Sequence, residues 1–135
     1  MIKYDDLIGV PFKNNGRDIK TGVDCYGLAM EVYSRFGIKL PEFFADYNDS
    51  DKISNIIHGQ MGSSVWREVN PPYPVPSLLA IRFGVPSPII NHTGVYIGNS
   101  RFIHIRGKTG VCIENIHSIA WRHVIAGFFI YKGQL

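Results

Sequence analysis

Three residues have the types and the order along the chain that nucleophilic catalysis requires: Cys25, His92 and His104. A cysteine in the first turn of a helix lies beside oriented backbone N–H groups and the positive end of the helix dipole, which favour its thiolate. A histidine within reach accepts the thiol proton, and a second polar side chain orients that imidazole. The pattern therefore indicates a nucleophile, a base and an orienting residue. The alternative is a structural role, because free cysteine and single histidines are often packed in a core.

The helix that carries Cys25 is predicted over residues 23–36. Asp24 is a suitable N-cap, and Gly37 follows the expected end. The apolar residues between them recur at helical spacing: Leu28, Ala29, Val32, Tyr33 and Phe36. A second helix is predicted from the acidic caps at 49–51 to Gly59 or Gly62, and short helices are predicted after Asp5 and Asp6 and at 118–123.

After four prolines between positions 71 and 76, the apolar pattern changes to a period of two. Strands are predicted over 78–83, 93–97, 101–106, 111–116 and 127–131, and an extended stretch begins at Trp66. Helices followed by strands indicate an α+β fold with an antiparallel sheet. The length fits a single domain over residues 1–135.

The hairpin between the two histidines decides whether they meet. A three-residue loop places Val95 opposite Ile103 on one apolar face. His104 then lies across from Gly94, which leaves room for it, and diagonal to His92 at about 7–8 Å. A two-residue loop would put the two histidines on opposite faces of the sheet. The apolar alternation favours the three-residue loop.

The other candidate residues give weaker signals. Cys112 alternates with apolar neighbours and is predicted to be a packed strand residue. A zinc site from Cys25, His92, His104 and Cys112 is conceivable in ligand type, but no pair has the short spacing of common zinc sites. No metal or other cofactor is therefore predicted. A phosphate-binding glycine loop and a GxSxG motif are both absent from the sequence.

Composition excludes several classes of protein. Two cysteines among 135 residues are too few for a disulfide framework, and 45% hydrophobic residues argue against disorder. The net charge of +3 comes from dispersed residues, which argues against binding to nucleic acid. The start of the chain lacks a signal peptide and no apolar run approaches the ~20 residues that span a bilayer, so we expect synthesis in the cytoplasm without membrane insertion.

Three segments resemble the signatures of NlpC-type cell-wall peptidases, which are papain-like cysteine peptidases of bacteria and their phages. The segments are Gly22-Val23-Asp24-Cys25-Tyr26-Gly27-Leu28, Asn91-His92-Thr93-Gly94-Val95-Tyr96-Ile97-Gly98 and Phe102-Ile103-His104. The resemblance runs from about Gly9 to the C-terminus. It implies N-terminal helices packed on a central antiparallel sheet, and hydrolysis of amide bonds in peptidoglycan stem peptides without metal. By position, Cys25 is the nucleophile, His92 the base and His104 the orienting residue.

The tyrosine form Asp24-Cys25-Tyr26-Gly27-Leu28 and the ending Trp121-Arg122…Ala126-Gly127-Phe128 look most like the phage-tail and prophage branch of this family. The implied partners are peptidoglycan stem peptides and phage tail proteins. The implied place of action is the cell wall, with a phage particle as carrier. The alternative is a weakly active or inactive assembly component of a phage tail.

Further site residues follow from the resemblance. Asp24, Tyr26 and Arg106 are the expected substrate-binding residues; for Arg106, which would bind a substrate carboxylate, solvated surface charge is the alternative. Phe12 stands where many members have a tyrosine whose hydroxyl helps to stabilise the oxyanion. Since Phe12 donates no such hydrogen bond, the backbone N–H of Cys25 is expected to take this role.

Overall fold

The structure, a computed structural model, describes residues 2–44, 46 and 49–132. Its elements follow in the order β1 (Arg17–Asp18), β2 (Gly22–Val23), α1 (Cys25–Arg35), α2 (Ser50–Met61), β3 (Trp66–Val69), β4 (Ser77–Ile81), β5 (His92–Gly98), β6 (Arg101–Arg106), β7 (Gly110–Asn115) and β8 (Ile125–Tyr131). Helices precede the main strands, so the α+β prediction is confirmed. The predicted boundaries of the strands lie within two residues of the observed ones, and those of β6 coincide.

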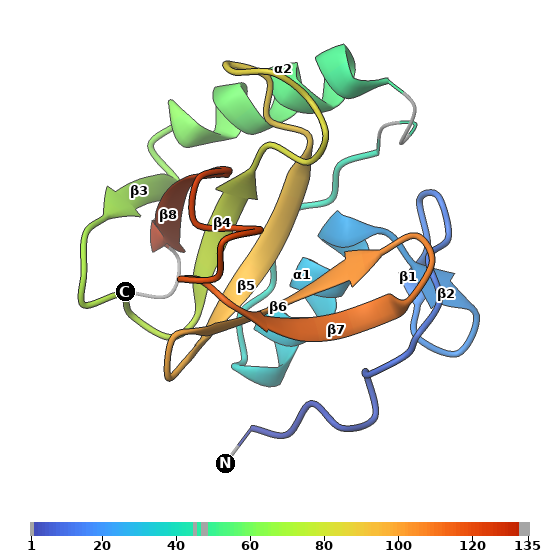
Figure 1. The fold of residues 1–135 in the computed structure, drawn as a ribbon. Coiled ribbons are helices and arrows are strands. Elements are labelled where there is room, and N and C mark those ends of the chain that lie inside the picture. Colours follow the sequence, from blue (N-terminus) through green and yellow to red (C-terminus); the bar gives the residue numbers. More distant parts are fainter. Residues whose placement is uncertain (1, 45, 47–48, 133–135) are drawn as a thin grey trace.

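The main sheet has six antiparallel strands in the order β3-β8-β4-β5-β6-β7 (Figure 1). β1 and β2 form a separate two-stranded ribbon. Helix α1 packs against β5 and β6, while α2 lies near β3 at the opposite end of the sheet. The sheet strands that contact α1 are therefore the two that carry the histidines.

Helix α1 forms where the sequence predicts it. The carboxylate of Asp24 caps its start by accepting a hydrogen bond from the backbone N–H of Gly27 at 2.8 Å. Its buried face is made of Leu28, Ala29, Val32 and Tyr33. Gly37 takes a positive φ of 77° directly after the end. Cys25 is the first residue of this helix, as expected.

The hairpin between β5 and β6 differs from the predicted one and still gives the predicted pairing. Its loop has two residues, Asn99 and Ser100, and both have the positive φ that a type I′ turn requires. The register then shifts by one residue between Tyr96 and Gly98, so that Ile97 forms a β-bulge. Beyond the bulge Val95 lies opposite Ile103, as predicted. The bulge therefore restores the face that the short loop would have reversed.

The two short helices predicted near the ends of the chain are wrong. Residues 5–9 and 118–123 form turns, in which Leu7 donates to the carbonyl of Tyr4 and Trp121 to that of Ser118. Segments this short do not repay the cost of helix nucleation. Leu7 and Trp121 are instead fixed by burial in the core.

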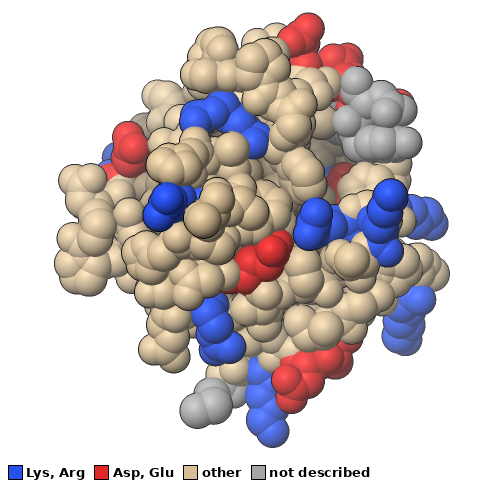
Figure 2. Space-filling model, in the orientation of Figure 1, with Lys and Arg blue, Asp and Glu red and all other residues tan. Residues whose placement is uncertain are grey.

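On one face of the molecule, charged side chains of both signs are dispersed. Figure 2 shows Lys and Arg groups in several parts of one face, with Asp and Glu among them. This face agrees with the mild net charge of the sequence. In the part of the chain that the structure describes, neither helix has the length and apolarity needed to cross a membrane.

Candidate active site

A cavity of about 450 Å³ lies between the start of α1, the start of β5 and helix α2. Cys25 and His92 both line it, together with Asp24 and Tyr26. The rest of the wall is largely apolar and comes from the segment after α1, from α2 and from the sheet: Phe43, Phe44, Ile53, Ile56, Ile57, Met61, Leu78, Ala80 and Phe83. The structure thus brings the predicted nucleophile and base into the lining of one cavity.

The thiol of Cys25 is not electrostatically activated in the resting structure. Burial raises its pKa above the usual range, and the carboxylate of Asp24 raises it further. Contacts with Thr93 and with the backbone of Tyr26 oppose this rise without cancelling it. The helix start alone favours a thiolate, but the folded environment keeps Cys25 protonated at neutral pH.

His92 and His104 form a direct hydrogen bond. Nε2 of His92 lies 2.9 Å from Nδ1 of His104, and the two rings are nearly perpendicular. Burial lowers the pKa of His92 to about 3, with the charge of a protonated His104 as a second cause. Burial also lowers the pKa of His104. Both imidazoles are therefore neutral at pH 7, and the pairing predicted from the hairpin is present.

Glu114 is the residue that the sequence analysis missed. Its carboxylate lies within hydrogen-bond distance of Nε2 of His104, at the end of the imidazole pair that faces β7. Partial burial is the largest single influence on Glu114 and would raise its pKa, but the hydrogen bond with His104 and the positive charge of Arg106 are among the contributions that together leave the pKa below its usual range. A signal was available: His104 pairs with Cys112 across β6 and β7, so Glu114, two residues on, is the diagonal neighbour of His104.

The chain of contacts from Glu114 assigns the proton positions on both rings. A carboxylate only accepts hydrogen bonds, so Nε2 of His104 carries a proton and its Nδ1 does not. Nδ1 of His104 then accepts from Nε2–H of His92, which leaves the lone pair of His92 on Nδ1. That is the tautomer in which His92 can accept a proton at Nδ1, the ring nitrogen that the pair with His104 leaves free.

Close packing holds His104 in this position. It is fully buried, with the ring of Trp121 at 4.6 Å and that of Phe102 at 4.8 Å between centroids. Gly94 lies beside it, and a Cβ at Gly94 would come within 3.4 Å of the Cβ of His104 and within 3.0 Å of Phe102. The expectation that Gly94 leaves room for the histidine is confirmed.

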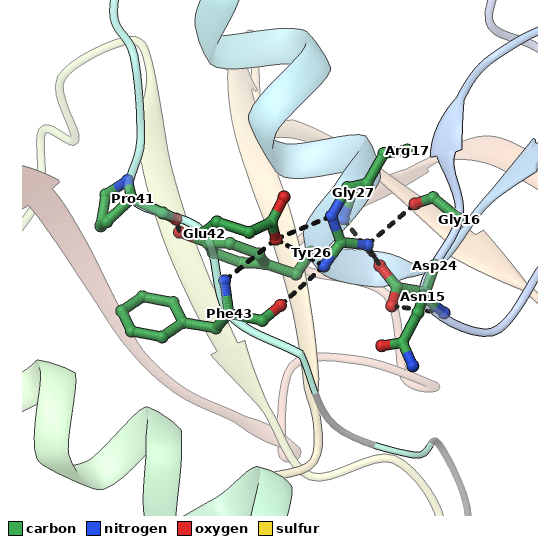
Figure 3. A network of polar contacts seen from close by, with 9 residues as sticks. All are labelled: Asn15, Gly16, Arg17, Asp24, Tyr26, Gly27, Pro41, Glu42 and Phe43. Atoms are coloured by element: carbon green, nitrogen blue, oxygen red, sulfur yellow. Dashed lines mark hydrogen bonds and ion pairs between the residues drawn. The ribbon is translucent and has the colours of Figure 1, made fainter.

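A polar network positions the residues on either side of Cys25 (Figure 3). Arg17 forms an ion pair with Asp24 at 2.7 Å and also bonds Glu42 and the carbonyl of Phe43. The hydroxyl of Tyr26 donates to the carbonyl of Pro41, on the same segment. Asp24 and Tyr26 are thus engaged in holding the segment 41–43 against the start of α1, and this segment forms part of the cavity wall.

Two further residues are placed by the structure. Phe12 lines the cavity, and its backbone forms an isolated bridge with Val23. Arg106 is not among the residues that line the cavity; its guanidinium lies 6.0 Å from the centre of the Trp121 ring. Arg106 is therefore placed near the outer end of the histidine pair, and not beside the thiol.

Solved structures define the class of fold. The chain superposes on an NLP/P60 family protein of Staphylococcus aureus with a TM-score of 0.65 and 20% identity, covering 94% of this chain and 39% of that one. For an NlpC/P60 family protein from Bacillus cereus the TM-score is 0.64 and the identity 23%, over 96% of this chain and 40% of that one. For the NlpC/p60 domain of the peptidoglycan hydrolase SagA the TM-score is 0.57 and the identity 20%, over 94% of this chain and 90% of that one. The fold is that of an NlpC/P60 domain, and the papain-like α+β prediction is confirmed.

Sequence relatives point the same way. The chain is 29% identical to the murein DD-endopeptidase MepS/murein LD-carboxypeptidase of Escherichia coli (strain K12), over 90% of this chain and 56% of the relative. It is 25% identical to the bifunctional muramidase/DL-endopeptidase CwlT of Bacillus subtilis, over 94% of this chain and 33% of the relative. The chain thus spans about half or less of these relatives. No family model matches it. The relatives and the solved structures support the NlpC/P60 family, and both of these relatives are named as peptidoglycan-cleaving enzymes.

Proposed function

We propose that the chain is a cysteine peptidase that hydrolyses peptide bonds in peptidoglycan stem peptides, with Cys25 as nucleophile, His92 as base and His104 as the orienting residue. The observation that carries the proposal is the 2.9 Å hydrogen bond between His92 and His104, together with the thiol of Cys25 in the lining of the same cavity as His92. The class of substrate is supported by the relatives, which are named as murein endopeptidases and DL-endopeptidases.

In the proposed reaction the resting thiol and imidazole are both neutral. As Cys25 attacks the carbonyl carbon, its proton passes to Nδ1 of His92, and the C–S bond forms. The oxyanion of the tetrahedral intermediate accepts a hydrogen bond from the backbone N–H of Cys25, which lies in the first turn of α1 and has no partner within the helix. His92 then protonates the leaving amine as the C–N bond breaks, and water releases the acyl group by the reverse sequence.

The test compares variants on purified muropeptides. We expect Cys25→Ala to abolish release of stem-peptide fragments, and mass spectrometry of the wild-type products to identify the cleaved bond. Ser34→Ala, on the exposed side of the same helix, is the matched control and retains wild-type turnover. Hydrolysis by Cys25→Ala at the wild-type rate would overturn the proposed mechanism.

The proposal includes delivery to the wall as part of a phage tail. The support is the resemblance of the segments around Cys25 and Trp121 to the tail and prophage branch. Immunogold labelling of tail tips, in a lysogen that carries this gene, tests the assignment. We expect label on the tail, and label confined to free protein would contradict it. Tails that assemble normally with Cys25→Ala and still lose wall digestion would favour the enzyme over the inactive assembly component.

A further inference from the structure

A second cluster of reactive side chains lies at the outer end of the histidine pair. Nε2 of His104, the thiol sulfur of Cys112 and a carboxylate oxygen of Glu114 all lie within 4.8 Å of one another. Cys112 pairs with His104 across β6 and β7, and Glu114 follows two residues later on the same face. None of the proposed catalytic steps uses Cys112. The proposed reaction therefore does not explain why these three side chains lie together.

These three groups match the ligand preferences of zinc. Imidazole nitrogen, thiolate sulfur and carboxylate oxygen are its usual protein ligands, at about 2.0–2.2 Å for nitrogen and oxygen and about 2.3 Å for sulfur, so ligand atoms in a tetrahedral site lie about 3.3–3.6 Å apart. To reach these separations the carboxylate of Glu114, which is in hydrogen-bond contact with His104, moves outward, and the thiol of Cys112, 3.9 Å from that carboxylate, moves inward. The side chain of Glu114 is 26% exposed on β7. Cys112 is half-buried beside it, so an ion has access from solvent and keeps a water as fourth ligand.

We propose that His104, Cys112 and Glu114 bind one zinc ion, and that bound zinc switches off the Cys25–His92 pair. The binding site stands on geometry alone, whereas the inhibition rests on the proposed function. The ion acts here as a regulator that competes with the hydrogen bond between His104 and Glu114.

The inhibition follows from proton positions. Zinc displaces the proton on Nε2 of His104 and that of the Cys112 thiol. A neutral imidazole that binds zinc through Nε2 carries its proton on Nδ1, and His104 takes this proton from Nε2 of His92. His92 in turn regains a proton on Nδ1, so one proton per zinc ion, the thiol proton of Cys112, is released to solvent. With its proton on Nδ1 and its Nε2 accepting from His104, neutral His92 neither takes the Cys25 proton nor protonates a leaving amine.

Metal binding is tested with the full chain and with two cysteine variants. Titration with Co²⁺ reports on thiolate ligation through a sulfur-to-cobalt charge-transfer band, and competition with a chromogenic chelator gives the Zn²⁺ affinity. We expect wild type and Cys25→Ala to bind one Co²⁺ with this band. We expect Cys112→Ser to lack the band and to bind Zn²⁺ at least about tenfold more weakly. Circular dichroism of Cys112→Ser and of Cys112→Ala verifies that the folded state is retained.

Two outcomes overturn the site. The first is that Cys25→Ala loses the charge-transfer band while Cys112→Ser keeps it, which would place the metal on the nucleophile. The second is that the wild-type protein binds no stoichiometric metal. The inhibition is tested by the ratio of activity with Zn²⁺ to activity with chelator. This ratio falls in wild type and stays near one in Cys112→Ser; equal falls in both overturn the inhibition. If the chain hydrolyses no muropeptide, the proposed function fails while the binding experiment still decides on the site.

Discussion

The carboxylate of Glu114 accepts a hydrogen bond from Nε2 of His104, on the side of that ring opposite His92. This contact ties a third strand, β7, to the two imidazoles of β5 and β6. Because a carboxylate has no proton to give, it fixes the tautomer of His104 and, through it, that of His92. Glu114 is thus a positioning residue for the proposed base.

Glu114→Gln is expected to lower kcat by about tenfold to a hundredfold, which is less than the 10²–10⁴ that a complete general base contributes. The amide oxygen of Gln still accepts a hydrogen bond from Nε2–H of His104, but its amide N–H₂ can instead donate to an unprotonated Nε2. Part of the population then has the proton of His104 on Nδ1, which is the tautomer that does not support His92 as a base. KM is expected to stay within twofold, because Glu114 does not line the cavity. The ¹⁵N spectrum of the two imidazoles is the independent readout, and it should show mixed tautomers.

Glu68→Gln, on β3 and away from the histidines, is the matched control. A Glu114→Gln enzyme with wild-type kcat and unchanged imidazole spectra would show that Glu114 contributes only to the packing of the sheet.

The raised pKa of Cys25 predicts an unusual alkylation profile. Iodoacetamide reacts with the thiolate, so in a Cys112→Ser background its rate with Cys25 should keep rising above the ordinary thiol pKa of about 8.5. Asp24→Asn removes a negative charge that raises this pKa, and it keeps an oxygen that caps α1. The midpoint of the profile should therefore move to lower pH in Asp24→Asn.

Glu31→Gln is the control for this shift, because Glu31 is an acid of the same helix that does not contribute to the Cys25 pKa. A midpoint below 8.5 in the parent protein, or a shift to higher pH in Asp24→Asn, would contradict the assignment of burial and Asp24 as the causes.

Gly94→Ala is expected to lower the free energy of unfolding by about 1–3 kcal/mol, as other insertions into packed cores do. The new methyl group would lie 3.0 Å from a ring carbon of Phe102 and 3.3 Å from the carbonyl of Ile103, and both neighbours are fully buried. Urea unfolding gives the measurement. Gly59→Ala, at an exposed position of α2 with open space around it, should instead gain up to about 1 kcal/mol. Equal free energies of unfolding for the two variants would show that Phe102 and Ile103 move aside for the new methyl group without a cost in stability.

The parts of the site that the sequence predicts are those with local signals. Asp24 and Gly37 mark the two ends of the helix of Cys25, and the alternation around Val95 and Ile103 sets the faces of the hairpin. The β-bulge at Ile97 could not be predicted, because it depends on how a two-residue turn is reconciled with a buried face. For this reason the predicted three-residue length of the β5–β6 loop is wrong, while the predicted pairing of Val95 with Ile103 is confirmed.

Other features depend on tertiary structure. Glu114 meets His104 through the register of a further hairpin, and the pKa of Cys25 depends on burial that no local pattern encodes. The apolar wall contributed by α2 follows from where that helix packs, which its own periodicity does not reveal.

The network of Arg17 gives the last prediction. Arg17 bonds the buried carboxylate of Asp24 and the carbonyl of Phe43, so Arg17→Gln should cost about 1.5–3 kcal/mol of stability, the range for hydrogen bonds to charged groups. Arg35 is equally buried, but its partner Asp6 is 59% exposed, and Arg35→Gln should cost about 0–1 kcal/mol. Since Phe43 lines the cavity, Arg17→Gln should also raise KM for muropeptides, while Arg35→Gln leaves it unchanged. Thermal unfolding and steady-state kinetics measure both effects. Equal losses of stability in the two variants would mean that burial of the partner carboxylate does not strengthen the pair.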